Sequence, residues 1–143
     1  MRETLFRGKR IYTKEWVKGS LVMVQDDETL NIYPNIVISY THDTFEVIPE
    51  TVSQFVNLTD KNGKPAFVGN IYKEVMLDGS ERLYRIFEVL GGFAINQFQD
   101  DFYKKDEDIL FYAGLSDPQT ASFFQHNLIE IGNIFDNKEL LIK

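Results

Sequence analysis

Turn signals built on glycine divide the chain into short segments with the character of β-strands. Asn62-Gly63, Asp78-Gly79 and Gly91-Gly92 each separate two apolar runs. Asn-Gly supplies two residues that tolerate positive φ, which predicts a type I′ hairpin between strands that end near Leu58 and resume near Ala66. The other predicted strands are residues 5–12, 16–17, 20–24, 31–34, 35–40, 44–48, 71–77, 82–90, 93–98, 109–112 and 128–135.

Prolines and capping residues mark the places where strands stop or helices start. Pro34 lacks an N–H donor for a strand ladder, so it predicts a sheet edge or a break between two strands. Pro49 and Pro118 suit the first turn of a helix, and Ser116 or Asp117 can cap the second of these helices. Helical pieces are therefore predicted over residues 50–56, 117–125 and 137–140, and a solvated loop over 100–108.

These elements predict a mainly β fold, with short strands in one or two small barrel-like or sandwich-like lobes and two or three short helices. The chain has 143 residues, which suits one domain over 1–143. If this domain has two lobes, the boundary falls near residues 56–60. Hydrophobic residues make up 43% of the chain, which is enough for a core.

Composition excludes several classes of protein. Fifteen Lys and Arg against 22 Asp and Glu give a net charge of −7, which argues against binding nucleic acid by overall charge. The chain has no cysteine, so it has no disulfide scaffold, thiolate zinc site or cysteine nucleophile. No run approaches the ~18 apolar residues of a membrane span, and the basic N-terminus lacks the apolar run of a secretory signal. We expect a cytoplasmic protein without membrane association.

Four groups of residues occur together in an order that resembles the YopX family of phage and prophage proteins. They are Arg2 with 5–9 and Trp16-Val17-x-Gly19; 47–55; 58–64 with Phe67-x-Gly69; and 129–141. Asn70 and Lys138 stand where the family pattern has Asp and Pro. The resemblance implies a mainly β fold, a phage or prophage origin and self-association. It brings no established reaction and no catalytic residues.

The candidate catalytic and metal-binding groups are dispersed along the chain. His42 and His126 lack metal-type spacing and suit surface or capping positions. The acidic groups suit solvated turns better than cation sites; they are 26–28, 100–101, 106–108 and the fragment Asp60-x-Asn62-Gly63. No catalytic residue, metal ligand or cofactor is predicted. A catalytic triad assembled in space stays open, so an uncharacterised enzyme is the third interpretation of the chain.

Basic residues near the N-terminus form the candidate nucleic-acid site. Arg2, Arg7, Lys9 and Arg10 are interleaved with aromatic residues, and Arg7 and Lys9 would share one face of a strand. Given the net charge of −7, we favour a structural role in which Arg7 holds a neighbouring loop carboxylate. A nucleic-acid-binding module is the alternative function.

Aromatic residues provide a candidate self-association surface. Phe123 and Phe124 are adjacent on the helix predicted over 117–125, so they cannot both lie at the centre of one narrow apolar stripe. One of them would face a partner, with Phe93 and Phe98 beside it; alternatively, both complete the core. We expect a non-enzymatic accessory protein that acts through protein contacts. Its partner would be a second copy, or a host or phage protein.

Overall fold

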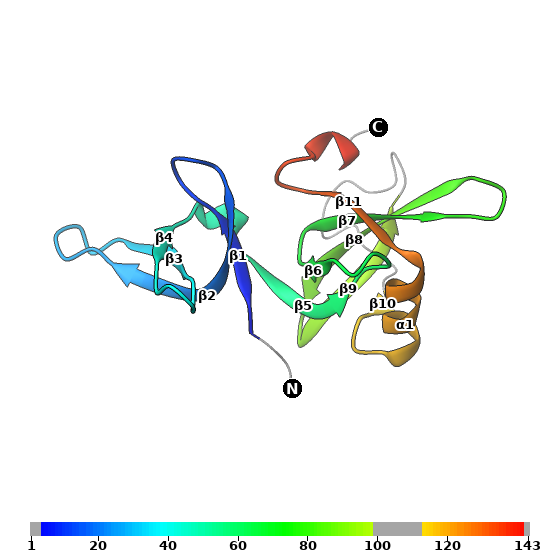
Figure 1. Ribbon diagram of the computed structural model, residues 1–143, viewed down its shortest axis with the longest axis horizontal. Helices are drawn as coiled ribbons and strands as arrows, with labels where there is room; N and C mark the ends of the chain where they lie inside the picture. Colours follow the sequence, from blue (N-terminus) through cyan, green and yellow to red (C-terminus); the bar gives the residue numbers. More distant parts are fainter. Residues whose placement is uncertain (1–3, 99–112, 142–143) are drawn as a thin grey trace. The chain divides into compact units, whose positions relative to one another are not determined.

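The computed structural model describes residues 4–98 and 113–141 and confirms the mainly β fold. The chain divides into two compact units, Met1–Phe55 and Val56–Lys143, hereafter the first and second units. It passes from one to the other within strand β5 (Ser53–Thr59). Within the described residues both sheets are antiparallel, and α1 is the one α-helix (Figure 1).

The first unit is a small curled sheet built on one long strand. Its elements are β1 (Phe6–Lys9), β2 (Trp16–Gln25), β3 (Ile32–Val37), β4 (Thr44–Glu46), the 3-10 turn η1 (Pro49–Thr51) and the start of β5. They form the order β4-β3-β2-β1-β5 of a six-stranded sheet, whose last strand, β6, pairs with β5 and belongs to the second unit. β2 pairs with β1 from Trp16 to Gly19 and with β3 from Ser20 onwards. A bridge between Arg10 and Val47 joins the segments that follow β1 and β4.

The sequence predicted two interruptions in the first unit that the structure does not contain. β2 runs without a break through Lys18-Gly19, because Gly19 lets the backbone approach that of Val37, whose carbonyl a Cβ would strike. Pro34 lies inside β3 instead of at an edge or break. Its carbonyl accepts the Val47 amide at 3.2 Å, so its backbone faces away from β2 and its missing N–H removes no bond to β2.

The helix predicted over 50–56 is also wrong. Only Pro49–Thr51 is helical, and the residues that follow are extended strand. Ser53 and Gln54 pair with Arg7 and Phe6 of β1, so pairing with a distant strand outweighs the local helical pattern.

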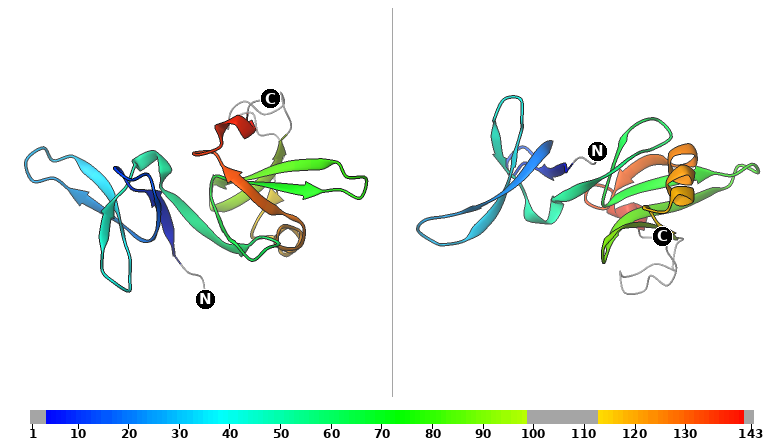
Figure 2. Two further views of the ribbon diagram at one scale, coloured as in Figure 1. Left: turned by 45° about the horizontal axis from the view of Figure 1, so that its top comes forward. Right: turned by 90° about the horizontal axis from the view of Figure 1, so that it is seen from below.

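The second unit is a five-stranded sheet with a helix on one face (Figure 2). Its elements are β6 (Pro65–Phe67), β7 (Asn70–Val75), β8 (Glu81–Val89), β9 (Gly92–Phe98), β10 (Ala113–Gly114), α1 (Pro118–Asn127), β11 (Ile129–Asn133) and the 3-10 turn η4 (Lys138–Leu141). The sheet order is β10-β9-β8-β7-β11. The core beneath α1 consists of Val56, Ala66, Tyr72, Tyr84, Ile86, Ile95, Leu115, Phe124 and Leu128.

Local signals predicted the helix of the second unit well. The Asp117 carboxylate accepts the Thr120 amide at 3.2 Å, with Pro118 in the first turn. The helix ends at Asn127, two residues later than expected. The closing turn expected near 137–140 is η4. The predicted loop 100–108 and strand 109–112 lie outside the described residues.

The hairpin at residues 60–64 is confirmed, but its predicted turn type is wrong. The Gly63 amide donates to the Asp60 carbonyl at 2.9 Å, and the Asp60 amide to the Lys64 carbonyl at 2.9 Å. Gly63 has a φ of 81°, whereas Asn62 is not among the residues with positive φ. The connection is therefore a type I turn followed by a left-handed glycine, and Gly79 closes the β7–β8 hairpin in the same way.

Candidate functional site

The cationic residues of β1 are held by the fold of the first unit. Arg7 is buried, its Nε donates to Ser53 Oγ at 2.8 Å, and its guanidinium lies 4.5 Å from the centre of the Trp16 ring. The ammonium group of Lys9 lies 5.7 Å from the same ring, which confirms that Arg7 and Lys9 share a face. Each cation therefore stabilises the packing of Trp16 on β1.

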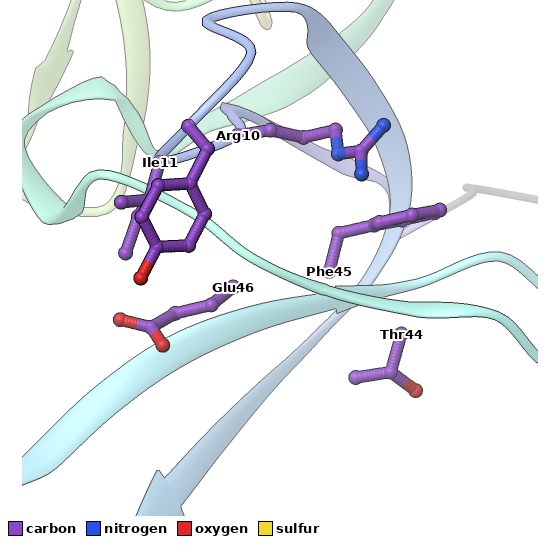
Figure 3. Close-up of a pocket in the computed structure, with 6 residues that line it drawn as sticks. Arg10, Ile11, Thr44, Phe45 and Glu46 are labelled. Carbon is purple, nitrogen blue, oxygen red and sulfur yellow. The ribbon is translucent and has the colours of Figure 1, made fainter.

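Arg10 belongs to a separate hollow in the first unit. This hollow has a volume of about 210 Å³ and is lined by Arg10, Ile11, Tyr12, Thr44, Phe45 and Glu46 (Figure 3). The guanidinium of Arg10 lies 4.2 Å from the centre of the Phe45 ring and 3.9 Å from the Glu15 carboxylate. Arg2 lies outside the described residues. The three described cations thus occupy two different environments, and the burial of Arg7 removes it from any exposed phosphate-binding surface.

Asp60 has a structural role that the sequence did not reveal. Its side chain is only 3% exposed, although a solvated turn was predicted. Oδ1 accepts the amides of Asn62 and Lys64 at 2.9 and 3.0 Å, and Oδ2 accepts the Glu130 amide at 3.0 Å. An Asp before Asn-Gly signals the turn, but nothing local signals the bond to β11.

Asn70 joins a second buried polar contact. Its side-chain amide donates to the Tyr72 hydroxyl at 3.0 Å and to the Glu130 carboxylate at 3.0 Å. These bonds tie β7 to β11. The polar residues buried at this end of the second unit therefore hold the sheet together.

The candidate aromatic surface divides between core and partly exposed positions. Phe124 is 0% exposed and contacts the Tyr72 ring edge-on, with ring centres 4.8 Å apart. Phe123 and Phe93 are half-buried and pack against the same core. Phe98 ends β9, and its side chain lies outside the described features. Phe124 is therefore a core residue, which leaves Phe123 and Phe93 as the members with exposed area.

The β2–β3 arm, residues 20–34 (Figure 1), carries exposed apolar side chains that the sequence did not predict. The exposed fractions are 43% for Val22, 55% for Met23, 65% for Leu30 and 63% for Ile32. The sequence signal is the unbroken apolar run 21–24, which is more typical of a strand buried on both faces. In the structure this strand has no described layer over these side chains.

The turn at the tip of the arm is fixed by Asp26. The Leu30 amide donates to the Asp26 carbonyl at 2.9 Å. The Asp26 carboxylate accepts the amides of Thr29 and Glu28 at 2.9 and 2.8 Å, and these bonds lower its pKa below the ordinary value. The arm therefore ends in a structured acidic turn.

The two histidines lie in separate elements, His42 in a loop and His126 in the last turn of α1. His42 has a φ of 61° in the loop before β4, and His126 Nδ1 lies 2.7 Å from the Ser122 carbonyl in α1. Within residues 4–98 and 113–141, no three His, Asp or Glu side chains cluster as a metal site. None of the helices that the structure describes has the length and apolar character needed to cross a membrane.

Comparisons with known proteins identify the fold and the family model that fits this chain. The family model described as YopX protein matches residues 5–142. No curated protein matches the chain. A crystal structure of protein EF1440 from Enterococcus faecalis superimposes with a TM-score of 0.51 and 20% sequence identity, covering 99% of each chain. At that identity the likeness concerns the fold.

Proposed function

The chain belongs to the YopX protein family, and on that premise we propose a phage- or prophage-derived accessory protein that acts in the cytoplasm through protein contacts. In this proposal its activity is self-association and not catalysis. The observation that carries it is the apolar β2–β3 arm of the first unit.

The arm supports a binding role because it exposes apolar side chains on both of its faces, two of them side by side on one face. Met23 and Ile32, which lies opposite Gln25 on β3, share one face of the arm, whereas Val22 lies on the other face. Contiguous exposed apolar surface is costly for an isolated chain and marks interaction sites. A hairpin of two strands is only marginally stable alone in water, so a partner that covers the arm would also stabilise it.

The polar residues support the same interpretation, because those singled out by the sequence serve the fold. Arg7 binds Ser53 and Trp16, Asp60 binds three backbone amides, and Asn70 binds Tyr72 and Glu130. These contacts supply a structural role for each of the three. They favour protein contacts over nucleic-acid binding by the β1 cations.

Light scattering across low to high micromolar concentrations tests self-association. We expect a mass above the 16.7 kDa of one chain, and we expect it to persist at high salt because apolar contacts are not screened. A mass of one chain at every concentration contradicts the proposal. Binding to nucleic acid that falls steeply with salt would favour the alternative function instead.

A further inference from the structure

The outer edge of β2 carries backbone groups that point away from β3. The Asp26 amide donates to the Asn31 carbonyl at 2.9 Å, so Asp26 and Asn31 form a hydrogen-bonded pair. Directly opposed residues of an antiparallel pair alternate between hydrogen-bonded and non-hydrogen-bonded. Leu21, Met23 and Gln25 therefore belong to the non-hydrogen-bonded pairs of the β2–β3 ladder, and their N–H and C=O groups point to the other side of β2.

That side of β2 is paired along only half of its length. β1 pairs with β2 up to Gly19, and from Ser20 to Gln25 no described strand continues along this edge. The opposite edge of the arm is different. On β3, Pro34 has no N–H to offer, and its carbonyl already accepts the Val47 amide. On its β3 side the arm is held by the Val47 amide at Pro34, whereas on its β2 side the described residues place no strand beyond Gly19.

We propose that two copies of this chain associate through the open edge of β2, in an antiparallel pair about a two-fold axis at Met23. This inference rests on the proposed self-association and names its surface. In this register Met23 lies opposite Met23 of the second copy, and Leu21 lies opposite Gln25. All the outward N–H and C=O groups of these residues then pair, and none of the β2 residues that pair with β1 is used.

The same register brings exposed apolar side chains of the two copies next to each other. Val22 of one copy lies opposite Val24 of the other on one face of the joined sheet, and the two Met23 side chains adjoin on the other face. A shift by one residue would oppose the outward N–H and C=O groups of one strand to residues whose groups point towards β3, and side chains of opposite faces would meet, so no ladder forms in that register.

Charge also favours an antiparallel pair of identical edges. The acidic turn at 26–28 of one copy lies at the Ser20 end of the other copy's β2 edge, beyond which β2 continues to the exposed Lys18, paired with Arg7 of β1. Each copy therefore brings its acidic tip towards the basic end of its partner's strand. A parallel arrangement would place the two acidic turns side by side.

Single cysteines test the register, because the natural chain has none. Met23→Cys places two thiols opposite each other across the axis, where the separation of opposed Cα atoms, about 5.5 Å, suits a disulfide. Gln25→Cys is the matched control on the same strand and face, since its thiols lie opposite Leu21 and not each other. We expect Met23→Cys to form a disulfide dimer at least about tenfold faster. A mixture of Leu21→Cys and Gln25→Cys should form the heterodimer preferentially.

A charge variant tests the edge independently. Met23→Lys puts like charges against each other on the axis while leaving the fold intact, because this side chain is already 55% exposed. We expect Met23→Lys to be a monomer with unchanged circular dichroism, and Leu77→Lys, at a fully exposed site in the second unit, to associate like the wild type.

The outcomes separate this inference from the proposed function. If the wild type is a monomer at every concentration, the proposed self-association fails, and this inference fails with it. If the wild type associates but Met23→Cys crosslinks no faster than Gln25→Cys, or Met23→Lys still associates, the β2 edge is not the surface. Self-association through another surface then stands.

Discussion

The two units are held together by different means. The described part of the second unit buries twelve apolar residues, among them Phe124, Tyr72 and Leu128. In the described part of the first unit, the fully buried apolar side chains are Ile36 and Val47. There, glycines permit close packing: a Cβ on Gly8 would lie 2.8 Å from the Val47 side chain, and one on Gly19 would strike the Val37 carbonyl.

The two units differ in how many of their apolar side chains they bury. The second unit buries many of its aromatic and aliphatic side chains in its own core. The first unit is held by few side-chain contacts, such as that of the Arg7 guanidinium with the Trp16 ring. Its apolar residues Val22, Met23 and Ile32 are exposed on the arm. A unit with a small core and a projecting apolar hairpin is suited to presenting a surface, whereas its neighbour is suited to stability.

The largest effect is expected from Phe124→Ala in the core of the second unit. Truncating this 0% exposed ring leaves a cavity beside Tyr72, which should lower the free energy of unfolding by about 3–5 kcal/mol. Trp16, the only tryptophan, reports the first unit by fluorescence, and circular dichroism reports both units. The unfolding transition followed by Trp16 fluorescence should shift less than the transition of the second unit followed by circular dichroism.

Phe123→Ala is the matched control on the same helix, and its half-buried ring should matter less. Equal losses for the two variants would contradict the assignment of Phe124 to the core. An identical shift of both transitions in Phe124→Ala would show that the units unfold as one.

The next effect is expected from Asp60→Ala. This change leaves the amides of Asn62, Lys64 and Glu130 without the carboxylate that accepts them, and it should cost about 2–4 kcal/mol in chemical denaturation. Asp78→Ala is the control, because Asp78 occupies the equivalent hairpin turn but is fully exposed. A loss for Asp78→Ala as large as that for Asp60→Ala would show that the bond to β11 is unimportant.

A smaller effect is expected in the first unit from Gly19→Ala. The added methyl group meets the Val37 backbone, which cannot rotate away, so β2 and β3 must separate at a cost of about 1–3 kcal/mol. The Trp16 transition should record this loss while the second unit keeps its stability. Ser20→Ala, one residue along the same strand at an exposed position, is the control. An unchanged Trp16 transition in Gly19→Ala would refute the role of close backbone approach.

The smallest effect concerns the alkaline stability of the second unit. Burial, and then the hydrogen bond to Glu74 at 2.9 Å, raise the pKa of Tyr84 from 10.0 to about 12. Because folding raises this pKa, the contribution is fully present below pH 10.0 and is lost as the pH rises towards about 12. Glu74→Gln should bring the pKa of Tyr84 closer to 10.0, as followed by tyrosinate absorbance. Glu88→Gln, at an exposed site on β8, should leave it unchanged.

Sequence patterns predicted the elements whose causes are local. Asp117 and Pro118 specified the start of α1, and Gly63 and Gly79 specified two hairpins, because capping and positive φ depend on a few neighbouring residues. The type of the turn at 60–64 was missed, since Asn62 can adopt either sign of φ and the bonds of Asp60 decide between them.

The errors concern features that depend on residues far along the chain. Pro34 looked like a break because its carbonyl partner, Val47, is thirteen residues away. Residues 53–55 looked helical because β1, their partner, begins at Phe6. The exposure of the arm was missed for the same reason: an apolar run shows that residues need covering, and only the assembled sheet shows what covers them.

The contact of Asp60 with Glu130 also bears on the order in which the chain folds. This bond joins residues 70 apart, and the Lys61 amide donates to the Leu128 carbonyl beside it. The described pairings of the first unit all lie within residues 1–55. During synthesis the first unit can form its sheet while the rest of the chain is still being made, whereas the second cannot close until β11 has left the ribosome. The apolar arm is therefore exposed to solvent, and to other nascent copies, before the second unit exists.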